Sequence, residues 1–366
     1  MRRRRIALIA ALGAAAVALP ADAERRTVWE LAAGPARADE SYRSWMAKGD
    51  DLVGRAAEQV NLGEGSRSRV NPVPLRAAEA YEKASQLRPR AAEPHYRAAE
   101  VLYAHFVDDV DHIGGDAIKP AERAIAHWDQ FAKLAPRDPR MSDMLFRRSI
   151  ALTKLGGMAN YKRAAADYDA ALRLEDAASA NPQQIALLLS NAAEIHMASG
   201  NLERAIELYS DSLDYNPKEL YGYGLIVALD RDGQATKALE MMQSYGYEQE
   251  VLFPDPRKET PPFFVPDGDV HWYISIGMES KGDYQSALNR MHQFLTFQPK
   301  SPYAARARER IKTLEAKLRR SKGKKPPPTG DEQYRPNWEM GPVEAPKSVD
   351  EKPGARPRGR AKKKSR

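Results

Sequence analysis

Residues 186–219 have the sequence ALLLSNAAEIHMASGNLERAIELYSDSLDYNPKE, and this stretch decides the fold of the chain. Apolar residues recur at helical spacing in both halves, and Gly200–Asn201 separates them, as the end of one helix and the start of the next require. In the second half, Ala205 allows a neighbouring helix to approach closely, and Tyr209 fills the space one turn later on the same face. Pro217 then ends the helix. The stretch therefore predicts two antiparallel helices.

The same alanine, large side chain and proline recur along the chain at fixed separations. The large residue follows the alanine by four positions, and the proline follows it by twelve. The copies are Ala77, Tyr81 and Pro89; Ala124, Trp128 and Pro136; Ala205, Tyr209 and Pro217; and Ala287, Met291 and Pro299. A further copy has Ala164, Tyr168 and Asp176 at these positions. Such recurrence indicates a stack of helix pairs.

On these residues, the chain resembles the tetratricopeptide-repeat proteins, whose unit is a helix pair of about 34 residues. Gly200, Ala205, Tyr209 and Pro217 match the family pattern, whereas Leu189 and His196 replace its tryptophan and tyrosine. The resemblance implies an all-α fold, a right-handed α-solenoid of about six helix pairs. Residues 302–320 are expected to form a solvent-facing capping helix. The N-terminal units carry insertions, and the fifth unit, residues 219–246, lacks the final proline.

Composition divides the chain into four parts. Residues 1–23 contain Arg2–Arg5, an apolar run over residues 6–19, and Ala21 and Ala23, a combination typical of a cleavable secretory signal. An uncleaved anchor and a transit peptide are the alternatives. Residues 24–38 are expected as a lead-in, residues 39–320 as the solenoid with its first helix within 39–60, and residues 321–366 as a disordered Pro/Lys/Arg-rich tail. The chain has no cysteine, which excludes disulfides and lipid attachment at a cleavage-site cysteine.

The net charge of +7 is unevenly distributed. Residues 319–366 contain 15 Lys and Arg against 6 Asp and Glu, whereas residues 24–318 contain 38 against 43. The basic tail has three open interpretations: a solvated extension, an arm attracted to an anionic envelope surface such as lipid or acidic polymer, or a nucleic-acid contact. Export separates the protein from cytoplasmic nucleic acid, so no nucleic-acid partner is expected.

In this family, partners bind in a concave groove that is lined by fixed positions of each first helix. The resemblance assigns nine partner-binding residues to this groove: Tyr96, Glu100, Tyr103, Phe146, Glu194, Tyr223, Asp230, Trp272 and Glu279. Aromatic side chains often dominate binding, so a protein or peptide partner is expected. The acidic members favour a partner that carries apolar side chains together with Lys or Arg. The alternative is that some of the aromatic residues pack against the preceding repeat.

Two further features concern the groove. The subclass of the family that binds terminal carboxylates uses Lys and Asn where this chain has Ser190 and Glu194, so that mode of binding is not expected. The acidic groove and the basic tail belong to one chain, which suggests the hypothesis that the tail occupies the groove in the absence of a partner.

Two segments stand apart from the repeats. Residues 105–116 have the sequence HFVDDVDHIGGD and would place His and Asp one turn apart if they were helical, a spacing that suits a divalent metal. The alternative is a solvated loop. We assign neither a metal nor a cofactor to this segment. Residues 247–267 are rich in Pro and Phe, and they either seal an irregular joint or fold over the groove. No sequence motif for nucleophilic, phosphate-loop or zinc-peptidase chemistry occurs, so no enzyme activity is expected.

The sequence therefore predicts a non-catalytic adaptor, exported to the periplasm or cell envelope, that binds partner polypeptides in a helical-repeat groove. The alternative is a protein that attaches to an anionic polymer or lipid surface through its basic tail. An enzyme that uses the His/Asp segment is the third hypothesis.

Overall fold

A computed structural model describes residues 28–61, 72–108, 113–175, 181–253, 265–266 and 268–321. This part of the chain contains α-helices and one 3₁₀ helix and no strand. The helices are α1 (Val28–Asn61), α2 (Pro72–Leu87), α3 (Glu93–Phe106), η2 (Gly115–Ala117), α4 (Ile118–Leu134), α5 (Met141–Leu155), α6 (Met158–Leu174), α7 (Pro182–Ala198), α8 (Leu202–Tyr215), α9 (Glu219–Arg231), α10 (Ala235–Tyr245), α11 (Gln249–Leu252), α12 (Val270–Ser280), α13 (Tyr284–Phe297) and α14 (Ala304–Ser321).

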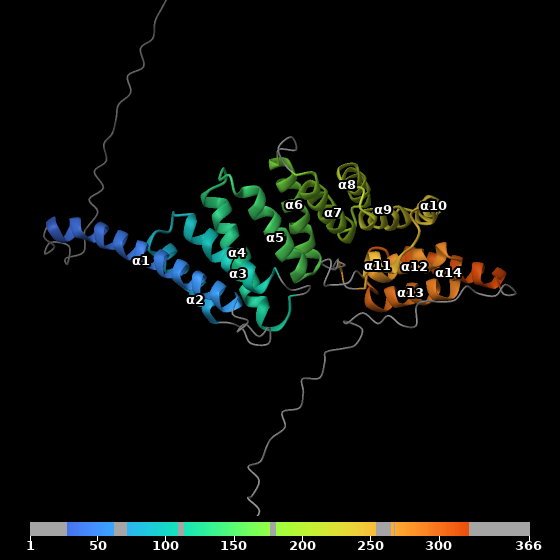
Figure 1. Cartoon of the computed structure of the whole chain (residues 1–366), viewed down its shortest axis with the longest axis horizontal. Helices are drawn as coiled ribbons and strands as arrows, with labels where there is room; N and C mark the ends of the chain where they lie inside the picture. Colours follow the sequence, from blue (N-terminus) through green and yellow to red (C-terminus); the bar gives the residue numbers. More distant parts are fainter. Residues whose placement is uncertain are drawn as a thin grey trace, which may run out of the picture.

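The helices pack as six successive pairs followed by one more helix. The pairs are α1/α2, α3/α4, α5/α6, α7/α8, α9/α10 and α12/α13, and α14 packs against α13. Figure 1 shows the pairs side by side in chain order, with α1 and α2 at one end of an elongated array and α12, α13 and α14 near the other. The expected all-α solenoid of helix pairs is confirmed.

The repeated residues lie where the helices approach one another. Ala77, Ala124, Ala164, Ala205 and Ala287 are all fully buried. The large residues one turn later are buried as well: Tyr81, Trp128, Tyr168, Tyr209 and Met291. A larger side chain at any of the alanines would separate two helices, because protein interiors leave little free volume. The pattern that predicted the fold is thus the pattern that builds its core.

Polar side chains mark the starts of helices, and a glycine marks an end, where the sequence predicts. At the start of α8 the side chain of Asn201 accepts a hydrogen bond from the backbone N–H of Arg204 at 3.4 Å, and at the start of α13 that of Asp283 accepts one from Ser286 at 3.1 Å. Gly200, between α7 and α8, has a φ of 92°, a conformation that side-chain-bearing residues rarely adopt. These contacts supply partners for backbone groups that a helix end leaves unpaired.

The N-terminal helix is longer than expected. It begins at Val28, inside the segment that was expected as a lead-in, and continues through the predicted first helix to Asn61. The signal segment, the basic tail beyond Ser321, residues 109–112 and 176–180, and most of the Pro/Phe-rich stretch lie outside the described residues. None of the helices in the described ranges is both long enough and apolar enough to cross a membrane.

Candidate binding groove

A groove with a cavity volume of about 880 Å³ lies among the first helices of consecutive pairs. Its lining comes from α3, α5, α7, α9 and α12, with additions from α6, α8 and the segment before α12. We call it the central groove. Its apolar lining residues are Phe146, Ile150, Leu187, Ile195, Leu220, Tyr221 and Val265. Leu187 is 44% exposed, so part of this apolar surface faces solvent.

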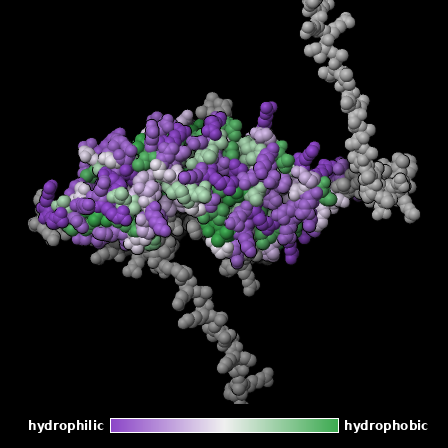
Figure 2. Space-filling view, turned by 180° about the vertical axis from the view of Figure 1, so that it is seen from behind, coloured by the Kyte–Doolittle hydropathy of each residue, from purple (hydrophilic) through white to green (hydrophobic). Residues whose placement is uncertain are grey.

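Apolar residues also gather on the outside of the molecule. Figure 2 shows a patch of them near the middle of the array, on a surface that is otherwise mostly hydrophilic. Exposed apolar surface on a soluble protein often marks a contact site.

Three of the nine predicted residues line the central groove: Tyr103, Phe146 and Glu194. Phe146 is half-buried and packs edge-on against Tyr168, with ring centroids 6.1 Å apart. Tyr103 is nearly buried, and its ring lies 5.5 Å from that of Trp128. These rings are held in place before any partner arrives, which lowers the entropic cost of binding.

Two more predicted residues lie beside the central groove, on α3. The guanidinium of Arg140 lies 4.1 Å from the centre of the Tyr96 ring, which in turn packs against Phe131. Glu100 forms an ion pair of 3.2 Å with Arg147, a groove residue. Burial raises the pKa of Glu100, and the positive charge of Arg147 opposes that rise.

The other four predicted residues are enclosed by the protein itself. Tyr223 and Trp272 are essentially unexposed, as are Asp230 and Glu279. The hydroxyl of Tyr223 donates to the carbonyl of Gly246 at 2.8 Å and accepts from the N–H of Glu248 at 2.9 Å. The expectation that all nine residues line one open groove is therefore not met, and the packing alternative describes these aromatic rings.

The enclosure of Asp230 and Glu279 is due to α14. Arg310 donates to Asp230 at 3.0 Å and also to Glu279, and Lys317 donates to Glu279 at 2.6 Å. The indole N–H of Trp272 donates to the second oxygen of Asp230 at 2.8 Å. The capping helix is thus not wholly solvent-facing, because its basic residues cover the acidic positions at this end of the solenoid.

Glu194, in the central groove, accepts hydrogen bonds from two tyrosine side chains. The hydroxyl of Tyr209 donates to its carboxylate at 2.5 Å and that of Tyr273 at 2.9 Å. The N–H of Val265 also reaches it, at 3.5 Å. Burial raises the pKa of Glu194, with a smaller contribution from Asp269 and opposition from the tyrosine hydrogen bonds.

Tyr209 reaches Glu194 from α8, the partner helix of α7, whereas Tyr273 reaches it because the solenoid curves. Tyr273 belongs to α12, 79 positions beyond Glu194 in the sequence, and yet it touches α7. Tyr303, just before α14, likewise donates to the carbonyl of Met197 on α7 at 2.6 Å. The Pro/Phe-rich stretch contributes Val265 to the groove lining. Its other residues, apart from Tyr247–Phe253 and Pro266, lie outside the described part of the chain.

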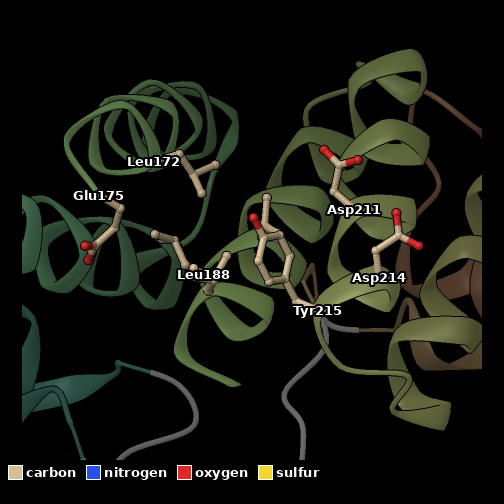
Figure 3. A pocket seen from close by; sticks show the side chains of 8 residues that line it. Leu172, Glu175, Leu188, Asp211, Asp214 and Tyr215 are labelled. Carbon is tan, nitrogen blue, oxygen red and sulfur yellow. The ribbon is translucent and has the colours of Figure 1, made fainter. Parts of the chain in front are cut away.

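A second cavity lies between α6, α7 and α8, away from the central groove. This outer cleft has a volume of about 530 Å³, and Leu172, Leu188 and Tyr215 form much of its apolar lining. Figure 3 shows Tyr215 between Leu188 and the two carboxylates of Asp211 and Asp214, with Glu175 on the opposite side. Burial and repulsion from neighbouring acids raise the pKa of Asp211.

Several groove residues were not predicted from the sequence. Leu187 and Leu220 are the second residues of their repeat units, a position that the family register assigns to the concave groove, so the register could have identified them. Arg147 and Tyr273 lie outside the positions that the register assigns, and only the curvature brings Tyr273 into the groove. Within the described ranges, no group of three or more His, Asp or Glu residues is arranged to hold a metal ion.

Comparison with known proteins gives partial matches. No protein-family profile matches the chain. The chain is 36% identical over 103 residues to the photosystem I assembly protein Ycf3 of Synechococcus sp. (strain CC9902) and 37% identical over 103 residues to that of Parasynechococcus marenigrum (strain WH8102). Each match covers 27% of this chain, and the chain spans 56% of the length of these relatives.

Solved structures resemble the chain at low identity. YrrB, described as a TPR protein with an unusual peptide-binding site, is 18% identical over 63% of this chain and 99% of its own, with a TM-score of 0.35. The MamA protein is 15% identical over 61% of this chain and 98% of its own, with a TM-score of 0.40.

In the described part of the chain, the repeat units expected from the sequence coincide with the helix pairs observed in the structure. The chain therefore has the tetratricopeptide-repeat fold, with six helix pairs and a closing helix.

Proposed function

We propose that this protein is a non-catalytic interaction scaffold that holds a segment of a partner polypeptide in the central groove. The observation that supports this most directly is the groove itself, about 880 Å³ in volume and lined by side chains from several consecutive first helices. Such a groove offers an extended row of apolar contacts, which suits a peptide segment better than a compact small molecule.

The lining indicates what kind of segment would bind. Phe146, Leu187 and Leu220 offer apolar contacts at neighbouring concave positions. The charge of Arg147 is already matched by Asp143 and Glu100, at 2.9 and 3.2 Å. Asp108 and Lys218 also line the groove and carry opposite charges, so Glu194 leaves the lining with a negative charge. We therefore propose a partner segment with apolar side chains and basic character.

The cellular setting is a separate proposal, which rests on the sequence. Arg2–Arg5, the apolar run over residues 6–19 and the small residues near Ala23 support export to the periplasm or envelope. The matched relatives are named as assembly proteins, which supports a scaffold role. Fractionation of cells expressing the full chain, beside a variant with Arg2–Arg5 changed to Glu, would test the location.

A second role rests on the basic tail. With 15 Lys and Arg against 6 Asp and Glu, residues 319–366 could hold the protein on an anionic polymer or lipid surface. Sedimentation with vesicles containing phosphatidylglycerol would test this, because truncation after Ser321 should abolish retention if the tail provides the attachment.

Selection from a defined peptide library tests the scaffold proposal. Random 12-residue peptides displayed on phage would be selected against the full chain, and the peptides obtained would be measured against two variants. Phe146→Ala should weaken binding at least tenfold, because it removes a groove contact. Leu174→Ala should not, because Leu174 is 54% exposed and lies outside the groove. Failure to select any peptide, or equal effects of the two variants, would contradict the proposal.

A further inference from the structure

The predicted groove contains four acidic residues, and the structure shows how three of them are neutralised. Glu100 pairs with Arg147 at 3.2 Å. Asp230 pairs with Arg310 at 3.0 Å, and Glu279 accepts from the same guanidinium. Each carboxylate therefore has an arginine as partner. Glu194 differs, because no Lys or Arg contacts it within the described part of the chain.

The surroundings of Glu194 make a missing cation costly. Its carboxylate is held by the hydroxyls of Tyr209 and Tyr273 and is only partly exposed, at the floor of the central groove. Tyrosine hydroxyls orient the carboxylate but bring no positive charge. Arg231, whose charge lowers the pKa of Glu194 in part, already pairs with Asp269 at 2.9 Å. A buried carboxylate without a cation retains an unfavourable desolvation cost, which a bound cation would offset.

The closing helix α14 shows which kinds of side chain pair with the acidic residues assigned to the groove. Arg310 of α14 reaches between Asp230 and Glu279 while Ala307, Ile311 and Leu314 of the same helix are buried. Two carboxylates that the family register assigns to the groove are thus paired, within the chain, with an arginine that buried apolar side chains flank. The central groove has the same components, a carboxylate with apolar neighbours, and no such segment in the described residues covers it.

We propose that Glu194 is the specificity determinant of the central groove, and that it pairs with a lysine or arginine of the bound segment, which apolar residues flank on both sides. This inference rests on the proposed scaffold function and names its partner chemistry. Tyr209 and Tyr273 position the carboxylate, and Phe146, Ile150 and Leu220 receive the flanking apolar side chains. Because the Glu194 carboxylate is already partly desolvated in the folded protein, forming the ion pair adds little further desolvation cost for the protein, and more of the attraction contributes to binding.

The experiment uses peptides selected from the random library against the full chain. The selected peptides should share a Lys or Arg between apolar residues. Replacing that residue by norleucine or citrulline should weaken binding to the unmodified protein by about tenfold to hundredfold, the usual range for a charge-assisted hydrogen bond. The same replacement should have little effect on binding to Glu194→Gln, because the interaction is already absent there.

Two control variants separate this site from general electrostatics. Asp211→Asn removes one negative charge from the outer cleft and should leave the preference for a basic residue intact. Arg257→Gln combined with Lys258→Gln removes the basic residues nearest in sequence to Val265, and it should also leave the preference intact. Circular dichroism establishes that each variant is folded, and the norleucine comparison on the unmodified protein does not depend on any variant.

The outcomes are distinguishable. If peptides bind in a manner that depends on Phe146 but show no basic preference, the scaffold function stands and the role of Glu194 is overturned. Equal losses from norleucine on the unmodified protein and on Glu194→Gln would also overturn it. If no peptide binds, the scaffold function itself fails.

Discussion

Removal of the Arg310 side-chain charge should loosen the C-terminal end of the solenoid selectively. Arg310 is 5% exposed and bridges two carboxylates, Asp230 and Glu279, that are buried. In Arg310→Met, the apolar part of the side chain remains, but both carboxylates lose a cation. Loss of one partner of a buried ion pair commonly costs about 3–5 kcal/mol, because the remaining charge stays buried.

The lower end of that range applies here. Glu279 keeps Lys317, which donates at 2.6 Å. Asp230 keeps the indole N–H of Trp272 at 2.8 Å and a longer ion pair with Arg306 at 3.9 Å. We therefore expect a loss of about 3 kcal/mol in the local free energy of opening. This corresponds to exchange of the protected amide hydrogens that is about 100-fold faster.

Hydrogen exchange measured by mass spectrometry is the suitable assay, because a repeat protein can open at one end without global unfolding. Peptides from α12, α13 and α14 should exchange faster in Arg310→Met, whereas peptides from α3 and α4 should not change. Arg308→Met is the matched control, since Arg308 lies exposed on the same helix and should change the opening free energy by no more than about 0.5 kcal/mol. A change below about 1 kcal/mol in Arg310→Met, or equal effects of the two variants, would refute the view that this bridge holds α14 in place.

Three further predictions concern packing and binding. Gly224→Ala should lower the urea midpoint of unfolding, because the added methyl carbon would lie 2.3 Å from a ring carbon of Tyr209. The overpacking costs about 1–3 kcal/mol, which outweighs the gain of about 1 kcal/mol in helix propensity. Gly54→Ala is the control and should not lower the midpoint, since its methyl group would meet nothing within 4 Å. Trp272→Ala should destabilise the chain by about 3–5 kcal/mol, because the ring is fully buried, whereas Phe146→Ala should mainly weaken peptide binding. Equal free energies of unfolding for the two variants would contradict the view that Trp272 is a core residue and Phe146 a groove residue. The affinity for Lys-containing peptides should fall as the pH is lowered through the raised pKa of Glu194, because protonation removes the charge that pairs with the lysine. The groups that influence this pKa are Tyr209, Tyr273, Asp269 and Arg231. For Glu194→Gln, the affinity should not change with pH over the same range.

The helix pairs could be predicted from the sequence because their determinants are local. Ala205 and Tyr209 lie one turn apart on a single helix, and Gly200 marks the turn before it. Each unit contacts chiefly its neighbours, so the same short pattern predicts the fold again in every copy. The start of α1 at Val28 was missed, since no repeated residue marks a terminal helix.

The accessible part of the groove could not be predicted in the same way. A concave position in the family register is open only if nothing later in the chain covers it. Trp272 occupies the same register position as Phe146, yet Trp272 is fully buried and Phe146 is half-buried. The difference arises from the curvature that brings Tyr273 of α12 to Glu194 of α7 and from the position of the closing helix. The sequence predicts the closing helix itself, but the surface that this helix covers has no local signature.

The acidic row of the groove illustrates why charge counts alone do not give partner preference. From the sequence, Asp230 and Glu279 favour a basic partner as strongly as Glu194 does. In the structure, Arg310 and Lys317 of α14 already neutralise the first two, so they contribute to stability and offer nothing to an external ligand. The charge available to a partner is what remains after internal pairing, and among the four acidic residues predicted for the groove it is Glu194 that retains it. Asp108 and Lys218 also line the central groove, and their charges are opposite. A preference for Lys or Arg should therefore depend chiefly on Glu194, and the Glu194→Gln substitution tests this.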